Sequence, residues 1–258
     1  MTRRWALIST IAVLTVALAF VGVQLVRGQD SEAKSTEAKP SASSSGEGGA
    51  TASLDGLGWW PLHRSGTAKV GEHDAVVGSG VKWTEGPEGG ALHLNGGRGY
   101  ADTNTRLDTQ TKDYSVAARV RLSDQGTKGM HTALSQDGER NSTFFLQYSG
   151  QDGNFAFSFP GARTVADTSE EPRPGQWYHL TGTYSQKDHR MRIYVDGKLA
   201  GTRVASSDVK PTGGVLIGRG KFGGKPTDYW RGDLADVHVY DRELTSREVS
   251  SLSSHEPG

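Results

Sequence analysis

The chain has 258 residues, no cysteine and a balanced charge, with 29 Lys plus Arg against 29 Asp plus Glu. Without a net positive field it lacks the electrostatic signature of a DNA- or RNA-binding protein, and without cysteine it has neither disulfides nor a thiol nucleophile. The 35 glycines are typical of an all-β protein with frequent tight turns.

Residues 1–28 are expected to lie outside the folded domain. Residues 5–26 form an apolar segment after Arg3 and Arg4, long enough as a helix to cross a bilayer of about 30 Å. The alternative is a signal peptide that is cleaved at the Ala-Leu-Ala of residues 17–19. We favour a membrane anchor because the apolar run continues past these residues to residue 26. Both interpretations predict an extracytoplasmic protein, membrane-anchored in the first and secreted in the second.

Residues 29–53 consist largely of Ser, Ala, Gly, Glu and Lys. Such a segment has too little apolar surface to offset the entropy of ordering, so it is expected to be a disordered linker. It would serve as a flexible tether for a single domain over residues 54–258.

The first strands of that domain are short. Strands are expected over residues 91–96 and 100–103, around a glycine turn. Residues 113–122 show a clearer pattern, because apolar side chains from Tyr114 to Leu122 alternate with polar or small ones. Further strands are expected over residues 130–136, 143–149 and 154–159.

Residues 176–201 predict three consecutive antiparallel strands. Two alternating runs are joined by a polar turn, and Asp196-Gly197 follows the second run. An Asp-Gly pair favours a type I′ hairpin turn, since both residues tolerate positive φ. In the second run Met191, Ile193 and Val195 are expected to face the core, with Arg190, Arg192 and Tyr194 facing solvent.

One helix is expected, over residues 244–252. Thr245 or Ser246 is a suitable N-cap, with Glu248 close behind it to complete a capping box. The remaining pattern predicts two packed antiparallel sheets.

Four motifs carry a family resemblance. They are PGQWYHL (residues 174–180), MRIYVDGKLAG (191–201), VLIGRG (215–220) and YWRGDLADVHVYDRELTSREVSSL (229–252). In this order and spacing they resemble the laminin G-like jellyroll domain, a branch of the concanavalin A-like lectin and glucanase superfamily. The resemblance implies a two-sheet antiparallel β-sandwich (jellyroll) in which His179, Trp177 and Trp230 are packing residues. His238 is expected to be an ordinary surface histidine.

The resemblance also implies a structural calcium ion where the last long strand meets the N-terminal segment. Calcium prefers six to eight oxygen ligands, which one carboxylate and several carbonyls can supply. The matching run GDLADVHVY retains Asp236, but Ala235 replaces an acidic residue that is common in the family. Asp236 and Asp74 are therefore the candidate metal ligands, with carbonyls from around Trp60 or the turn at residues 71–74.

The enzymes of this superfamily typically carry Glu-x-Asp-x-Glu on one strand, and the sequence lacks this motif. Glu170 and Glu171 are adjacent and would point to opposite faces of a strand, which does not suit the paired carboxylates of glycoside hydrolysis. We therefore expect a module without catalytic activity.

Three glycine-containing loops, residues 124–129, 137–142 and 220–229, are candidates for a ligand rim. A polysaccharide or glycoconjugate is the expected ligand, because sugar sites combine aromatic surfaces with a few polar groups. Adhesion to a cell-surface protein is the alternative, and an unrecognised glycoside hydrolase is a third. The candidate binding residues are Lys221, Phe222, Asp228, Tyr229, Arg140 and Asn141.

Overall fold

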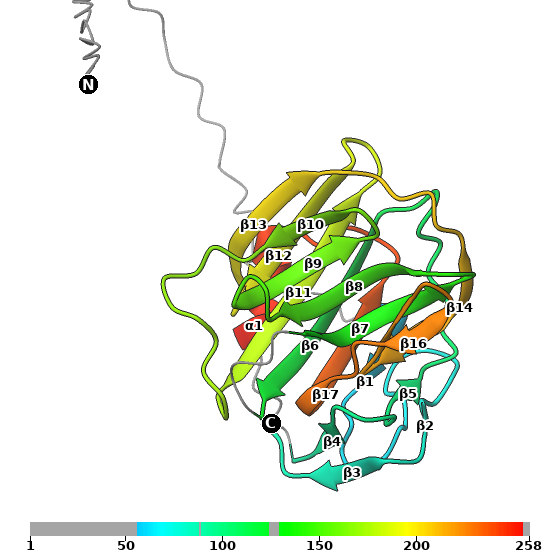
Figure 1. Ribbon diagram of the computed structural model, residues 1–258, viewed down its shortest axis with the longest axis vertical. Coiled ribbons are helices and arrows are strands. Elements are labelled where there is room, and N and C mark those ends of the chain that lie inside the picture. The colour runs from blue at the N-terminus through cyan, green and yellow to red at the C-terminus, as the bar shows by residue number, and fades with distance from the viewer. Residues whose placement is uncertain (1–55, 88, 124–128, 255–258) are drawn as a thin grey trace, which may run out of the picture. The chain divides into compact units, whose positions relative to one another are not determined.

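The computed structural model describes residues 56–87, 89–123 and 129–254 (Figure 1). The expected anchor or signal segment and the expected linker lie outside these residues, as does most of the 124–129 loop. Within the described part of the chain, no helix is long and apolar enough to cross a membrane.

The described residues form two antiparallel sheets packed face to face, which confirms the expected all-β sandwich (Figure 1). The eight-stranded sheet has the order β13 (Lys198–Val204), β12 (Arg190–Val195), β11 (Trp177–Ser185), β6 (Tyr114–Leu122), β17 (Arg231–Tyr240), β4 (Ala91–Asn95) and β3 (Val81–Thr84), with β1 (Gly58–Trp60) also paired to β17. The seven-stranded sheet has the order β10 (Ala162–Val165), β9 (Asn154–Phe159), β8 (Ser142–Ser149), β7 (Met130–Gly138), β14 (Pro211–Ile217), β5 (Ala101–Asp102) and β2 (Val76–Val77). A separate hairpin joins β15 (Gly220–Phe222) and β16 (Lys225–Thr227).

One large apolar core fills the space between the sheets. The alternating side chains of β6, Tyr114 to Leu122, enter it as their spacing predicts, and so do Phe155, Phe157 and Phe159 of β9. Trp230 and His179 are buried, as expected. Trp177 is only half-buried, because its ring lies on the outer side under the Arg121 guanidinium, 4.8 Å from the ring centroid.

The hairpin between β12 and β13 is also confirmed. Asp196 and Gly197 have φ of 48° and 76°, the positive values that a type I′ turn requires. The strands expected around the 96–100 glycine turn both form, but they do not pair with each other. β4 belongs to the eight-stranded sheet and β5 to the seven-stranded sheet, so this turn carries the chain between the layers.

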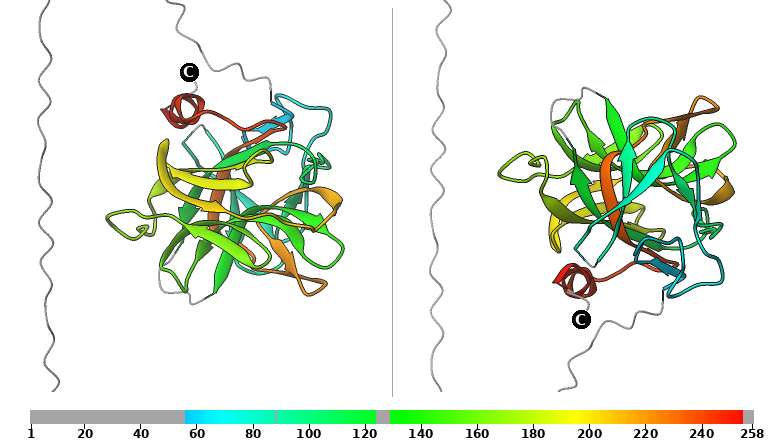
Figure 2. Two further views of the ribbon diagram at one scale, coloured as in Figure 1. Left: turned by 90° about the horizontal axis from the view of Figure 1, so that it is seen from above. Right: turned by 90° about the horizontal axis from the view of Figure 1, so that it is seen from below.

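The C-terminal helix α1 (Ser246–Ser254) lies outside the sandwich layers (Figure 2). Its N-cap is a capping box, in which Glu248 accepts the Thr245 N–H at 2.8 Å and Thr245 Oγ1 accepts the Glu248 N–H at 3.3 Å. A second apolar cluster joins it to the eight-stranded sheet through Ala117, Tyr194, Tyr240, Leu244, Val249 and Leu252. The prediction that Tyr194 faces solvent is therefore wrong, because α1 packs over the Tyr194 side chain and leaves it 2% exposed.

Candidate functional site

A groove of about 480 Å³ lies on the outer side of the seven-stranded sheet. Phe144 and Leu146 of β8 point into the core, so the alternation of the strand places Phe145 and Gln147 on the outside. We call this site the hairpin groove, because the β15–β16 hairpin contributes to its lining. The lining side chains that matter here are Phe145, Gln147, Arg163, Arg203, Phe222 and Asp228.

The hairpin is held in place at its turn by the loop between β7 and β8. Asn141 Oδ1 accepts the Gly223 N–H at 2.9 Å, and the Arg140 carbonyl accepts the Gly224 N–H at 2.7 Å. Lys221 Nζ donates to the Gly138 carbonyl at 3.0 Å. Two of the three candidate loops therefore meet at one place.

The base of the hairpin is tied to β7. The Asp228 carbonyl accepts the Thr132 N–H at 2.7 Å, and His131 Nδ1 lies 2.9 Å from the Tyr229 carbonyl oxygen. All six residues predicted to bind a ligand therefore cluster around this hairpin, but only two of them, Phe222 and Asp228, line the groove. The other four position the hairpin: Lys221, Tyr229, Arg140 and Asn141.

The groove combines an apolar wall with polar groups of both charges. Phe222 is 61% exposed, although phenylalanine side chains are usually buried. Burial raises the pKa of the Asp228 carboxyl above its usual value, against a hydrogen bond from Thr227 Oγ1 at 3.1 Å. On the floor, Gln147 Nε2 donates to Ser158 Oγ at 3.0 Å.

Arg163 is fixed at the edge of the groove. Its guanidinium donates to Asp152 Oδ2 at 2.7 Å and to Ser149 Oγ at 3.3 Å, and its carbonyl accepts a hydrogen bond from Arg203 at 3.0 Å. Two guanidinium groups therefore lie beside an exposed aromatic ring and one carboxyl. Such a set can stack against an apolar face and hydrogen-bond to hydroxyl groups. Glycoside hydrolysis normally uses two carboxyl groups. Among the described residues that line the groove, Asp228 alone has a carboxyl group.

The candidate metal ligand Asp236 lies elsewhere, on β17 of the eight-stranded sheet, beside the paired strand β1. Its Oδ1 accepts the Trp59 Nε1–H at 2.8 Å and lies 2.8 Å from His238 Nε2, while Arg119 Nε is 3.6 Å from Oδ2. Burial alone would raise the pKa of Asp236, but the hydrogen bonds and positive charge around it hold the pKa well below its usual range. Asp236 and His238 are each 4% exposed, so the expectation of a surface His238 is wrong.

These partners do not fit a calcium ion. The oxygens of Asp236 face nitrogen donors, whereas calcium needs several converging oxygens. Asp74 Oδ1 caps a local turn by accepting the Ala68 N–H at 2.9 Å. Over the described ranges, no group of three or more His, Asp or Glu side chains is arranged to hold a metal. The contacts of Asp236 with Trp59, His238 and Arg119 therefore lie at the position where the family resemblance predicts calcium.

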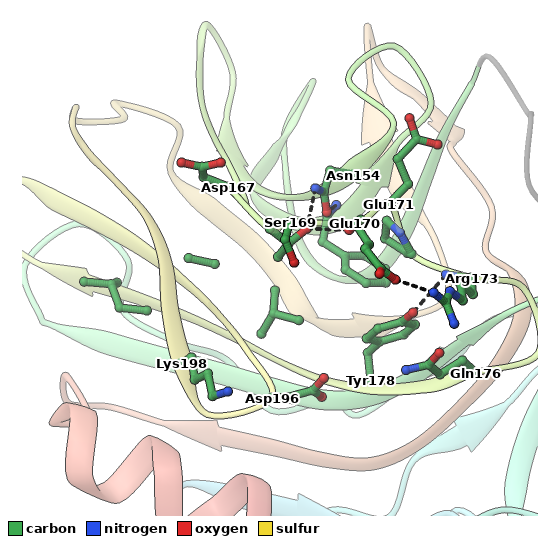
Figure 3. Close-up of a pocket in the computed structure, with 16 residues that line it drawn as sticks. Asn154, Asp167, Ser169, Glu170, Glu171, Arg173, Gln176, Tyr178, Asp196 and Lys198 are labelled. Atoms are coloured by element: carbon green, nitrogen blue, oxygen red, sulfur yellow. Dashed lines mark hydrogen bonds and ion pairs between the residues drawn. The ribbon is translucent and has the colours of Figure 1, made fainter.

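Sequence reasoning missed a second pocket, of about 470 Å³ (Figure 3). We call it the loop pocket, because the loop over residues 166–176 contributes much of its lining as it passes from β10 to β11. Glu170 and Glu171 would point to opposite faces if they lay on a strand, but both lie in this loop and both line the pocket. The sequence signal that could have revealed it is the acidic, proline-containing run at residues 167–172.

Comparison with known proteins identifies the fold family. Residues 95–250 match the laminin G family that is described as the concanavalin A-like lectin/glucanases superfamily. The chain belongs to this superfamily. Human neuronal pentraxin-1 is 25% identical over 150 residues, which cover 55% of this chain and 34% of the pentraxin. The rat sushi, von Willebrand factor type A, EGF and pentraxin domain-containing protein 1 is 25% identical over 145 residues, 54% of this chain and 4% of that protein.

The chain thus spans about a third or less of these two curated superfamily relatives. Two solved structures share the concanavalin A-like fold. Domain 4 of an extracellular arabinanase from Geobacillus stearothermophilus, in complex with arabinotriose, has a TM-score of 0.61 and 18% identity over 77% of this chain and 98% of that domain. Trypanosoma rangeli sialidase has a TM-score of 0.58 and 21% identity over 83% of this chain and 35% of the sialidase.

Proposed function

We propose that this concanavalin A-like domain is a non-catalytic carbohydrate-binding module and that the hairpin groove holds the sugar. The observation that carries the proposal is the exposed ring of Phe222 in a groove whose other lining groups include Arg163, Asp228 and Gln147. Sugar rings present apolar C–H faces and hydroxyl edges, so they match an aromatic surface beside polar side chains. The arabinotriose complex of the arabinanase domain supports a carbohydrate ligand.

Each lining residue has a distinct role in this proposal. Phe222 stacks against the apolar face of a sugar ring, while Asp228 accepts hydrogen bonds from hydroxyl groups and Arg163 donates to them. The expected ligand is a polysaccharide or glycoconjugate. The apolar residues 5–26 would anchor the module outside the cytoplasm, or direct its secretion, with residues 29–53 as a tether.

A glycan-array screen of the full chain, followed by calorimetry on the glycans that bind, tests the proposal. We expect Phe222→Ala to weaken binding about tenfold, the effect of losing roughly 1.4 kcal/mol of contact. Phe222→Tyr keeps the aromatic face and should retain affinity. Val76→Ala is the matched control, since Val76 is 62% exposed on β2 and is not part of the groove lining.

Two outcomes would overturn the proposal. One is the absence of binding to every glycan class on the array, which would favour the alternative of a cell-surface protein partner. The other is glycan binding that Phe222→Ala and Asp228→Asn leave unchanged, which would place the sugar elsewhere on the domain.

A further inference from the structure

We propose that helix α1 is a latch that leaves the eight-stranded sheet and unfolds locally while the sandwich stays folded. Its release uncovers a polar and aromatic face of that sheet. The hairpin groove lies on the other layer, the seven-stranded sheet. The latch is therefore independent of the proposed sugar site.

The helix itself has little intrinsic stability. Five of its nine residues are serine, which has only moderate helix propensity because its hydroxyl competes for backbone hydrogen bonds. Two of these hydroxyls do so here, since Ser253 Oγ donates to the Ser250 carbonyl at 2.9 Å and Ser254 Oγ donates to the same carbonyl. Isolated helices shorter than about 12 residues are marginal in water, so α1 stays helical only while it is docked.

The apolar part of the docking contact is small. Val249 and Leu252 are the two buried side chains of α1. They form a cluster with Ala117, Tyr194 and Tyr240 of the sheet that is separate from the main core. Because the main core lies between the sheets and includes neither helix residue, release of α1 would leave it intact.

The C-terminal end of the helix spans strand β11. On one side, Arg119 Nη2 of β6 donates to the Ser253 carbonyl at 3.2 Å. On the other side, the β12–β13 turn comes so close that a Cβ added at Gly197 would lie 2.3 Å from Ser253 Oγ. His179 of β11 lies between these two contacts, because it pairs with Arg119 and its N–H donates to Asp196 Oδ1 at 2.8 Å.

Two polar side chains are enclosed under α1. His179 and Thr181 alternate with the core residue Leu180, so both point to the helix side of the sheet, and both are at most 1% exposed. Thr181 pairs with Ala117 and Tyr194, which both belong to the helix cluster. Within the described chain, no hydrogen-bond partner is present for either ring nitrogen of His179 or for the Thr181 hydroxyl.

These unpaired groups favour release of the helix. A buried polar group without a hydrogen bond has lost its interaction with water and gained none in return, so it opposes the docked state. When α1 leaves, His179 and Thr181 regain water, which offsets part of the lost apolar contact of Val249 and Leu252. The docked helix is therefore only weakly favoured over the released one, which is the condition for a latch.

Hydrogen–deuterium exchange of the full chain at neutral pH tests the latch. We expect the backbone amides of α1 to exchange roughly a hundredfold faster than those of the central strands β6 and β17, because α1 opens without global unfolding. Thr181→Val keeps the side-chain shape but removes the unpaired hydroxyl, so it should slow exchange in α1 about tenfold. His179→Leu should act in the same direction, whereas Val249→Ala should speed exchange about tenfold because it weakens the apolar contact.

A control and a second readout complete the test. Thr212→Val is the matched control, since Thr212 is exposed on β14 of the seven-stranded sheet, and it should leave exchange in α1 unchanged. Trypsin cleavage after Arg247, which is exposed on α1, requires local unfolding and should rank the variants in the same order. Thermal melting verifies that each variant is folded. Exchange in α1 as slow as in β6 and β17 would overturn the proposal, and so would exchange that neither Thr181→Val nor His179→Leu slows.

Discussion

Asp236 is predicted to stabilise the fold through its protein partners. Asp236→Asn removes the negative charge that faces Arg119 and His238. The asparagine keeps one oxygen that can accept an N–H, and it tolerates the φ of 49° observed at this position. Removing one partner of a buried ion pair costs about 3–5 kcal/mol, and the retained oxygen places this variant near 3 kcal/mol. For a domain of roughly 200 residues this corresponds to a fall in Tm of about 6–12 °C.

The assay is thermal unfolding followed by circular dichroism, for the wild type and Asp236→Asn, each with calcium and with EGTA. We expect a lower Tm for the variant and no effect of calcium or EGTA on the wild type. The pKa of Asp236 lies below its ordinary value of 3.8, so its stabilisation is present above that pH and is lost as the pH falls. An unchanged Tm in the variant, or a wild-type Tm that falls with EGTA, would refute the reasoning.

Two further predictions concern His179 and the helix cap. Burial, together with the charge of Arg119, lowers the pKa of His179 from 6.5 to about 3. Between pH 6.5 and pH 3 this histidine is therefore protonated in the unfolded chain but neutral in the folded domain. The free energy of unfolding consequently falls as the pH drops through this range. Denaturant unfolding should show a loss of about 2 kcal/mol between neutral pH and pH 5, and His179→Leu should remove that portion of the pH dependence. Thr245→Ala should cost about 1 kcal/mol through loss of the capping box, whereas Thr245→Ser should be nearly neutral; equal unfolding midpoints for the two variants would contradict the cap.

The strands were predictable where one face of a strand differs sharply from the other. Residues 114–122 and the hairpin at Asp196-Gly197 are examples, since alternation and turn chemistry are local properties. The burial of Tyr194 and His238 was not predictable, because it depends on distant parts of the sequence. Helix α1 packs on Tyr194, and the ring of Trp59, from the neighbouring strand β1, stacks on His238.

The candidate site was predictable only in part. The glycines around Phe222 indicated a loop with a tight turn. Long-range contacts, such as the hydrogen bond between Asn141 and Gly223, determine which neighbouring side chains face the groove, and the sequence does not show them. The loop pocket was missed because Glu170 and Glu171 were interpreted by strand periodicity. That periodicity does not apply in a loop, where tertiary packing sets the direction of each side chain.

The pairing of β1 with β17 determines how the domain would respond to mechanical force. Gly58 pairs with Val239, and the strands are antiparallel, so the chain enters and leaves the sandwich at the same end of this pair. Tension applied to both flanks would therefore peel the hydrogen-bonded pairs one after another instead of shearing them together. Detachment of β1 would then remove Trp59 from Asp236 and open the buried ion pair to water. Peeling of β1 and exposure of the buried Asp236 carboxylate would thus be one event.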